Sequence, residues 1–458
     1  MNSANKMGTM NMTKLLINMS WPLMISLLVQ SLYNIVDSIF VARLSETALT
    51  ATSLAFPVQI MMIAVSVGTS VGINALLAKS VGAKDYKITT NIAVTGIILA
   101  LMGMFVFMVL SFWSDSFSAL FTDDEVIAGY CSRYLFICML FCGGTFIGTM
   151  FQRFLTAVGN TFDSMVTLVA GALTNIVLDP ILIFGLLGFP AMGIGGAAIA
   201  TVIGQWVTAF LAVLLNKIHN PYVKVNFSGY KPEKSVLLQI YKVGLPTIIT
   251  QGLSSAMIAA ANVILMPFSP TAVAFFGVYY KLQNFLFMPM NGLGQAAITI
   301  VGYNYGADKK HRIVELFKSI IPIAVGIAAA ATIIFLIIPS PLLKLFSASD
   351  EMLAMGVPAL RIISVTFIFA SITLVLGYSV SGLGNGVVNM LGTGIRQFIL
   401  LIPVMYVFTK FFGISFAWYS FWIAELAAAL YSAAATLREL KKKNIFPEKD
   451  NNNSSENL

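Results

Sequence analysis

Long apolar runs, separated by short polar stretches, divide most of the chain into segments of similar length. Each run reaches the roughly 20 residues that a helix needs to cross the hydrocarbon core of a bilayer. A single segment satisfies its own backbone hydrogen bonds in lipid only as a helix. The pattern therefore predicts an all-α integral membrane protein with twelve transmembrane helices, at about 15–40, 51–78, 88–113, 127–152, 163–187, 193–215, 237–266, 271–301, 316–339, 352–378, 387–411 and 414–437.

Composition supports this class, because 58% of the 458 residues are hydrophobic and only 10% are charged. A soluble domain carries about 25% charged residues. The first apolar run is too long for a cleavable signal peptide, and no small-residue cleavage site follows it. We therefore expect the first run to remain as a transmembrane helix.

The net charge of +8 could indicate a nucleic-acid partner, but its distribution argues against one. With the N-terminus inside, most of the 27 basic residues fall in predicted cytoplasmic segments, Arg153 and Arg396 among them. The outer loops instead collect acids, such as Asp124 and Glu351. This positive-inside asymmetry predicts a multi-pass protein of the cell membrane with both termini in the cytoplasm and no nucleic-acid partner.

The two halves of the chain repeat one another. Trp21-Pro22 corresponds to Leu245-Pro246 at an offset of 224, and Gly159-Asn160 corresponds to Gly384-Asn385 at 225. Each half carries six runs, so the halves enter the membrane from the same side. We expect two six-helix bundles related by a pseudo-two-fold axis along the membrane normal. The predicted divisions are an N-terminal bundle 1–215, a cytoplasmic linker 216–236, a C-terminal bundle 237–438 and a disordered cytoplasmic tail 439–458.

Asp37 is one of very few acids inside an apolar run. A carboxylate at membrane depth is costly and is a functional-site hypothesis by default, and burial favours its neutral form. In the fifth run, Asn175 and Asp179 are four residues apart and share a helix face. Together with Asn34 and Thr201, these oxygens suit Na⁺, or two carboxyl groups that share a proton. The alternative is that each acid only caps a kinked helix or pairs with a polar neighbour.

The repeat does not duplicate these acids. Ala261 corresponds to Asp37, and Val404 corresponds to Asp179. A purely architectural acid would be expected in both halves, so we expect ion coupling in the N-terminal bundle alone.

Other polar residues inside the runs could line or support a substrate path: Gln30, Tyr33, Gln205, Gln283, Lys281 and Glu425. The alternative for Lys281 and Glu425 is a mutual charge pair, which removes two buried costs at once. Pro22 and Pro180 each fall within a run, where proline produces a kink that is either a hinge or a fixed bend. The three cysteines, Cys131, Cys138 and Cys142, share one run and are expected to be ordinary core residues.

Several motifs are absent from the sequence. There is no G-x-x-x-x-G-K-[ST] phosphate loop, so ATP is not the direct driver. No nucleophile–base arrangement or cluster of metal ligands is evident. We expect neither an enzyme nor a cofactor, and no metal beyond Na⁺ at Asp37 and Asp179.

These features resemble the MATE family, the multidrug and toxic compound extrusion transporters, over about 14–440. The resemblance rests on Pro22, the Asp37 region, Val81-Gly82-Ala83-Lys84-Asp85, Val158-Gly159-Asn160, Asn175-xxx-Asp179-Pro180, Gly196–Thr201 and Val301-Gly-Tyr-Asn-Tyr-Gly-Ala307. It implies a V-shaped pair of bundles, cation binding at Asp37, Asn175, Asp179 and Thr201, and exchange of H⁺ or Na⁺ for organic cations. Some members carry further acids in spans 7 and 8, and this chain has none there.

The resulting hypothesis is an antiporter that exports organic cations or amphiphilic drugs by alternating access. The alternative is a lipid-linked saccharide flippase of the same superfamily. A flippase would favour a cationic cavity to meet a pyrophosphate, for which Lys281 and Arg396 are the candidates. A membrane enzyme or receptor would need a catalytic or binding arrangement that the sequence lacks. Nothing in the sequence indicates a stable oligomer, so we expect a monomer in contact with lipid.

Overall fold

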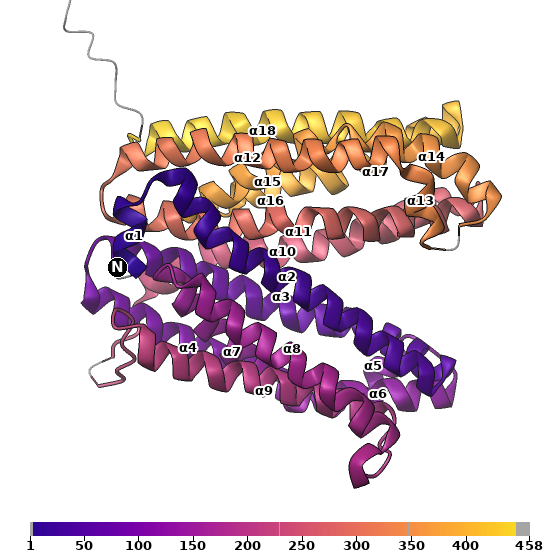
Figure 1. Ribbon diagram of the computed structural model, residues 1–458, viewed down its shortest axis with the longest axis horizontal. Coiled ribbons are helices and arrows are strands. Elements are labelled where there is room, and N and C mark those ends of the chain that lie inside the picture. Colours follow the sequence, from indigo (N-terminus) through magenta and orange to yellow (C-terminus); the bar gives the residue numbers. More distant parts are fainter. Residues whose placement is uncertain (1–2, 229, 347, 446–458) are drawn as a thin grey trace, which may run out of the picture.

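The computed structural model describes residues 3–228, 230–346 and 348–445, and the regular elements within them are helices (Figure 1). The N-terminal half contains α1 (Ser3–Thr9), α2 (Met12–Leu44), α3 (Glu46–Gly82), α4 (Tyr86–Leu110), η1 (Ser111–Trp113), α5 (Ser114–Ala119), α6 (Glu125–Leu140), α7 (Gly143–Ala157), α8 (Thr161–Phe184), η2 (Leu186–Gly188) and α9 (Ile194–His219). The C-terminal half contains α10 (Lys234–Leu265), α11 (Pro270–Gly306), α12 (Lys310–Ile337), α13 (Pro339–Lys344), α14 (Asp350–Ser364), α15 (Phe367–Gly382), α16 (Val387–Gly394), η3 (Ile395–Ile399), α17 (Leu401–Phe412), η4 (Ile414–Tyr419) and α18 (Ser420–Lys442). Residues 446–458 of the predicted tail lie outside the described residues.

The predicted spans agree with the helices. Ten helical segments in the described residues are long and apolar enough to cross a membrane, and two bent pairs bring the number to twelve. The pairs are α6 with α7, bent by 46°, and α14 with α15, bent by 49°. The two pairs occupy equivalent places in the two halves. The predicted all-α, twelve-span fold is therefore confirmed.

The repeat seen in the sequence is also present in the backbone. Helices α3 and α11 begin and end 224 residues apart, and α7 and α15 end 225 residues apart. Gly159 and Gly384, which close the equivalent turns, have φ of +82° and +85°. This left-handed conformation favours glycine because it has no Cβ. The shared turn geometry confirms that the halves are two copies of one helical scaffold.

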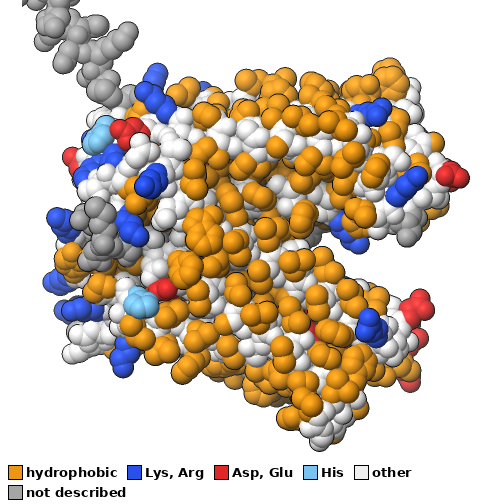
Figure 2. All heavy atoms as spheres, viewed as in Figure 1, with side chains coloured by type: hydrophobic (Ala, Val, Ile, Leu, Met, Phe, Trp, Pro, Cys, Tyr) orange, Lys and Arg blue, Asp and Glu red, His pale blue; other side chains and the backbone are white. Residues whose placement is uncertain are grey.

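The two halves separate at one end of the molecule and meet at the other. Figure 2 shows a hollow between the lobe formed by α2–α9 and the lobe formed by α10–α18. The hollow opens at the end where acidic side chains gather, and basic side chains cover the closed end (Figure 2). The beginning of α2 and the end of α18 lie at the basic end (Figure 1).

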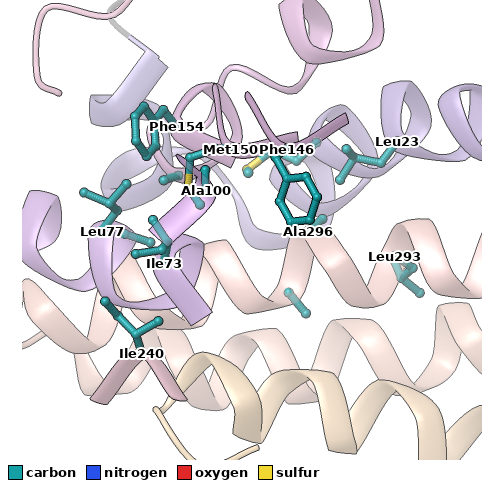
Figure 3. Packing of buried hydrophobic residues seen from close by; sticks show 14 of the residues in the cluster. Leu23, Ile73, Leu77, Ala100, Phe146, Met150, Phe154, Ile240, Leu293 and Ala296 are labelled. Atoms are coloured by element: carbon teal, nitrogen blue, oxygen red, sulfur yellow. The ribbon is translucent and has the colours of Figure 1, made fainter. Parts of the chain in front are cut away.

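Close backbone contacts join the halves near the basic end. A Cβ atom added at Gly82 would lie 2.0 Å from the carbonyl oxygen of Tyr303, and one added at Gly306 would lie 1.8 Å from that of Lys79. These two glycines are related by the repeat, so α3 and α11 approach symmetrically. An apolar cluster with members from both halves, including Ile73 and Leu293, continues this contact (Figure 3).

Polar side chains on α3, α7 and α11 also join the two halves, and we call this line of contacts the seam. Asn74 on α3 donates from Nδ2 to Thr299 Oγ1 on α11 at 3.1 Å, and Thr156 Oγ1 donates to Asn74 Oδ1 at 3.1 Å. Arg153 Nη1 on α7 donates to Gln295 Oε1 on α11 at 2.8 Å. Arg153, predicted in a cytoplasmic segment just after a span, lies within α7, and its guanidinium joins the two halves.

Candidate functional site

Two carboxyl groups meet inside the N-terminal half. Asp37 lies on α2 and Asp179 on α8, and these helices pack against each other. Asp179 is fully buried, and its carboxyl group lies close enough to that of Asp37 for the two groups to interact directly. Two adjacent carboxylates cannot both remain charged without a neutralising partner. We refer to Asp37 and Asp179 as the dyad.

An amide and a hydroxyl extend the dyad. Asn175 Nδ2 donates to Asp179 Oδ1 at 3.2 Å and to Thr201 Oγ1 of α9 at 3.4 Å. The first contact confirms that Asn175 and Asp179 share a helix face. Because Asn175 is 3% exposed, its geometry is set by helix packing rather than by solvent.

Glycines bring Thr201 within reach of α8. A Cβ atom at Gly171 would lie 1.9 Å from Thr208 Oγ1, and one at Gly204 would lie 2.7 Å from the carbonyl oxygen of Gly171. Only residues without a side chain allow α8 and α9 to approach this closely. The small residues of this pair of helices therefore position the oxygen ligands.

Several oxygens of the site have no hydrogen-bond donor among the described residues. They are Asp37 Oδ1, Asp179 Oδ2, Asn175 Oδ1 and, one turn beyond Thr201, Gln205 Oε1. Buried polar atoms of native proteins nearly always have a partner. Oxygens of this kind suit a proton shared between carboxyl groups or a hard cation. The arrangement can therefore take up one small positive charge and release it.

The other residues predicted around the dyad differ in their burial and in their contacts with it. Tyr33 is half-buried and lies within electrostatic reach of both Asp37 and Asp179, and the side chain of Gln30 lies next to it one turn earlier on α2. Asn34 is exposed on α2, and its backbone carbonyl accepts a hydrogen bond from Ser38 Oγ at 2.9 Å. The structure thus places Tyr33 beside the dyad, with Gln30 one turn before it, while Asn34 is exposed on the same helix.

Sequence reasoning missed Tyr134 on α6. Its ring is 4% exposed, and its hydroxyl accepts from Gln59 Nε2 at 3.5 Å. The same hydroxyl lies next to the side chain of Thr201 and within electrostatic reach of Asp37. A tyrosine in an apolar run gives no signal of this kind, because aromatic residues commonly fill helical cores.

The predicted alternative of a Lys281–Glu425 charge pair is wrong. Glu425 on α18 is 3% exposed, and its Oε1 lies 3.6 Å from Nε of Arg396 in η3. The side chain of Lys281 is exposed on α11. The assignment of Arg396 to a cytoplasmic segment is also wrong, because η3 lies inside the span from Val387 to Phe412. Gln283, also predicted on the substrate path, is buried on α11.

Pro22 and Pro180 both lie inside continuous helices, α2 and α8. Pro180 leaves the carbonyl of Ile176 without its helical donor, one turn from the dyad. A hinge role for either proline stays a prediction. The three cysteines are free and buried.

Comparison with known proteins gives consistent results. The family model MatE matches residues 22–181 and 246–407. The multidrug export protein MepA of Staphylococcus aureus is 26% identical over 423 residues, which cover 91% of this chain and 92% of MepA. MepA of Staphylococcus haemolyticus is 25% identical and covers 91% of each chain.

Solved structures agree in fold. The outward-facing conformation of a multidrug resistance MATE family transporter of the MOP superfamily superposes with a TM-score of 0.89 at 24% identity. The match covers 97% of this chain and 99% of that one. A MOP superfamily transporter from Pyrococcus furiosus, described as having a binding pocket of reverse polarity, gives a TM-score of 0.88.

Proposed function

Because the chain belongs to the MatE family of multidrug export transporters, we propose that it is a secondary active antiporter. It exports organic cations or amphiphilic drugs in exchange for H⁺ or Na⁺. The dyad carries this proposal, because it is a buried pair of carboxyl groups with oxygens that lack donors. Such a pair in a membrane helix bundle is costly unless an ion or proton neutralises it.

The proposed cycle is alternating access. In the conformation seen here the hollow opens at the acidic end, and the halves are sealed at the basic end (Figure 2). The positive-inside rule makes the basic end cytoplasmic, so this conformation faces outward and both termini lie inside. Neutralisation of the dyad from outside then favours substrate release, and loss of the ion to the cytoplasm restores the charged form.

The cycle works only if the free energy of ion binding differs between the two conformations. An ion shifts the equilibrium only if its affinity differs between the two conformations. A difference of about 5.5 kcal/mol moves the population from 1:99 to 99:1. Asp37 lies on α2, which packs on α8 of its own half and on α11 of the other half. A change in the dyad is therefore coupled to the contact between the halves.

The lipid-linked saccharide flippase is not favoured. It would need several cations that converge on a pyrophosphate, whereas of the two candidates Lys281 is exposed on α11 and only Arg396 is buried. The chain is further expected to work as a monomer in lipid, without a cofactor or nucleic-acid partner, and to act as a transporter rather than an enzyme. Lys281, Gln283 and Glu425 stay candidates for the substrate path.

Uptake of a fluorescent cation, rhodamine 123, into inverted vesicles tests the proposal. A pH gradient and a Na⁺ gradient are imposed in turn, with the membrane potential clamped by K⁺ and valinomycin. Wild type is compared with Asp37→Asn and Asp179→Asn, and with Asp123→Asn, which removes an exposed acid of an outer loop. We expect one gradient to drive uptake by wild type and the Asp123 variant, and neither to drive uptake by the dyad variants.

The outcomes separate the parts of the proposal. Uptake by a folded Asp37→Asn protein that equals wild-type uptake would remove the dyad from coupling. Wild type that responds to neither gradient, across a panel of organic cations, would refute the antiport. Labelled lipid would then be the next substrate to test.

A further inference from the structure

The C-terminal half contains a second buried charge pair, which the dyad mechanism does not use. Arg396 of η3 and Glu425 of α18 are 14% and 5% exposed in their side chains, and their Nε and Oε1 atoms lie 3.6 Å apart. A buried ion pair repays its desolvation only with good geometry and with hydrogen bonds to its remaining polar atoms. The Nε–Oε1 distance of this pair is longer than a hydrogen bond, and Glu425 Oε2 has no hydrogen-bond partner among the described residues.

The unsatisfied atoms lie close together. Arg396 offers five N–H donors, yet the structure gives its guanidinium no hydrogen bond to any described residue. The guanidinium lies beside Glu425 and over the ring of Phe287, whose centroid is 6.0 Å from Cζ. Glu425 Oε2 is also buried without a partner in the described part of the chain, and the hydroxyl of Tyr279 lies near it. A charged cluster with so many free hydrogen-bonding positions can accept polar groups of a ligand.

The backbone at Arg396 departs from the regular α-helix. Residues Ile395–Ile399 form a π-helical turn, a rare conformation that is frequent at functional sites. Gln397 Oε1 ties the turn to α10 by accepting from Ser254 Oγ at 2.9 Å. The equivalent residues of the N-terminal half, 170–174, lie within the uninterrupted helix α8. The repeat places Gly171 and Ala200 where Arg396 and Glu425 stand, so this charge pair is particular to one half.

The cluster lies toward the other half. Tyr378 on α15 is within electrostatic reach of both Arg396 and Arg153. Its hydroxyl donates to Asn291 Oδ1 of α11 at 3.3 Å. Arg153 comes from α7 and reaches α11 at Gln295. Arg396 therefore lies on the inner side of its bundle, near the seam that closes the hollow.

We propose that Arg396 is a recognition site for the carboxylate of amphoteric substrates, which carry an anionic and a cationic group. The inference deepens the proposed function and rests on it. The planar guanidinium fork matches a carboxylate in bidentate geometry. Glu425 lies against the Nε side of the guanidinium and competes with the carboxylate of the ligand for this cation. The dyad in the opposite half supplies the negative charge for the cationic group of the substrate. The internal pathway thus has an acidic side and a basic side.

A matched pair of dyes tests this inference. Rhodamine 110 carries a free carboxylate, and rhodamine 123 is its methyl ester. Binding of each to the purified full chain in lipid nanodiscs is measured by fluorescence anisotropy. We expect Arg396→Gln to weaken binding of the acid about tenfold, as loss of a charged hydrogen bond does, and to leave ester binding within about twofold. Glu425→Gln removes the competitor and should strengthen acid binding, so the two variants move in opposite directions.

Controls separate recognition from folding. Lys410→Gln removes an exposed cation of α17, the next helix along the chain, and should leave the acid-to-ester ratio at the wild-type value. The double variant Arg396→Gln with Glu425→Gln leaves no unpaired buried charge, and should bind the acid as weakly as Arg396→Gln alone.

The ratio also separates this inference from the proposed function. Wild type that binds the ester but not the acid, or a ratio that Arg396→Gln leaves unchanged, overturns the inference. Equal losses for both dyes in both single variants mean a structural role and overturn it as well. Acid binding that behaves as expected, together with no gradient-driven uptake of the ester, overturns the antiport alone.

Discussion

Gly82→Ala should shift the protein away from the conformation described here. The added Cβ would lie 2.0 Å from the carbonyl oxygen of Tyr303 and 2.8 Å from its carbonyl carbon. Both atoms belong to the backbone of α11, so no flexible side chain can yield. The contact joins the two halves and exists only while the basic end is closed.

The size of the shift follows from the cost of overpacking. Such a clash costs about 1–3 kcal/mol, which corresponds to about a 5- to 150-fold change in an equilibrium constant. In alternating access this cost falls on the outward-open conformation alone. A protein that favours that conformation tenfold would then populate the opposite one substantially, without unfolding.

Spin labels at the outer ends of the two halves can measure this shift. Leu120 and Leu345 are both exposed, at 78% and 77%, and are related by the repeat. Cysteines introduced at these two positions report the opening of the hollow by double electron–electron resonance, while the native cysteines are buried. We expect Gly82→Ala to add a population at shorter distance. Gly326→Ala is the control, because a Cβ there meets nothing within 4 Å. A distance distribution equal to wild type in folded Gly82→Ala would refute the reasoning.

Three further predictions concern neighbouring contacts. Asn74→Ala removes the amide that joins Thr299 and Thr156. The same spin labels should report that the conformational equilibrium shifts by about 1–3 kcal/mol toward the shorter distance, and an unchanged distance distribution would mean that Asn74 does not help to close the basic end. Gly171→Ala would place a Cβ 1.9 Å from Thr208 Oγ1 within one half, so it should lower the thermal unfolding temperature and leave the label distances unchanged. Tyr134→Phe should raise the ion concentration for half-maximal transport by about tenfold or more, as losses around ion ligands do, and unaltered ion dependence would make this hydroxyl structural.

The helices and their repeat could be predicted because lipid imposes a strong rule on sequence. Every spanning segment must be apolar and helical, and duplication leaves matching glycines and prolines at a fixed offset. Arg153 directly follows the predicted run 127–152, whereas α7 continues to Ala157. Arg396 was assigned to a cytoplasmic segment on its charge alone, although it lies inside the predicted run 387–411. Only the packing of the helices shows that Arg153 binds Gln295 and that Arg396 pairs with Glu425 inside the protein.

The candidate site could be predicted only as far as one helix allows. The spacing of Asn175 and Asp179 fixes their shared face, and the structure gives them a direct hydrogen bond. The meeting of Asp37 with Asp179 depends on how α2 packs on α8, which no spacing encodes. Tyr134 lies on a third helix, and Glu425 takes a partner other than Lys281, for the same reason.

Helix α2 connects the chemistry of one half to the position of the other. It carries Asp37 and packs on α11, where a Cβ at Gly292 would lie 2.9 Å from the backbone nitrogen of Met24. Met24 lies two residues beyond Pro22, where the helix lacks one backbone hydrogen bond and bends most easily. An ion that changes the charge of the dyad acts toward the C-terminal end of this helix, while the contact of Met24 with α11 resists movement nearer its middle. If α2 is the coupling element, Gly292→Ala should uncouple ion binding from the opening of the hollow and leave the dyad intact. Spin-label distances that still respond to the ion in this variant would place the coupling in α8 instead.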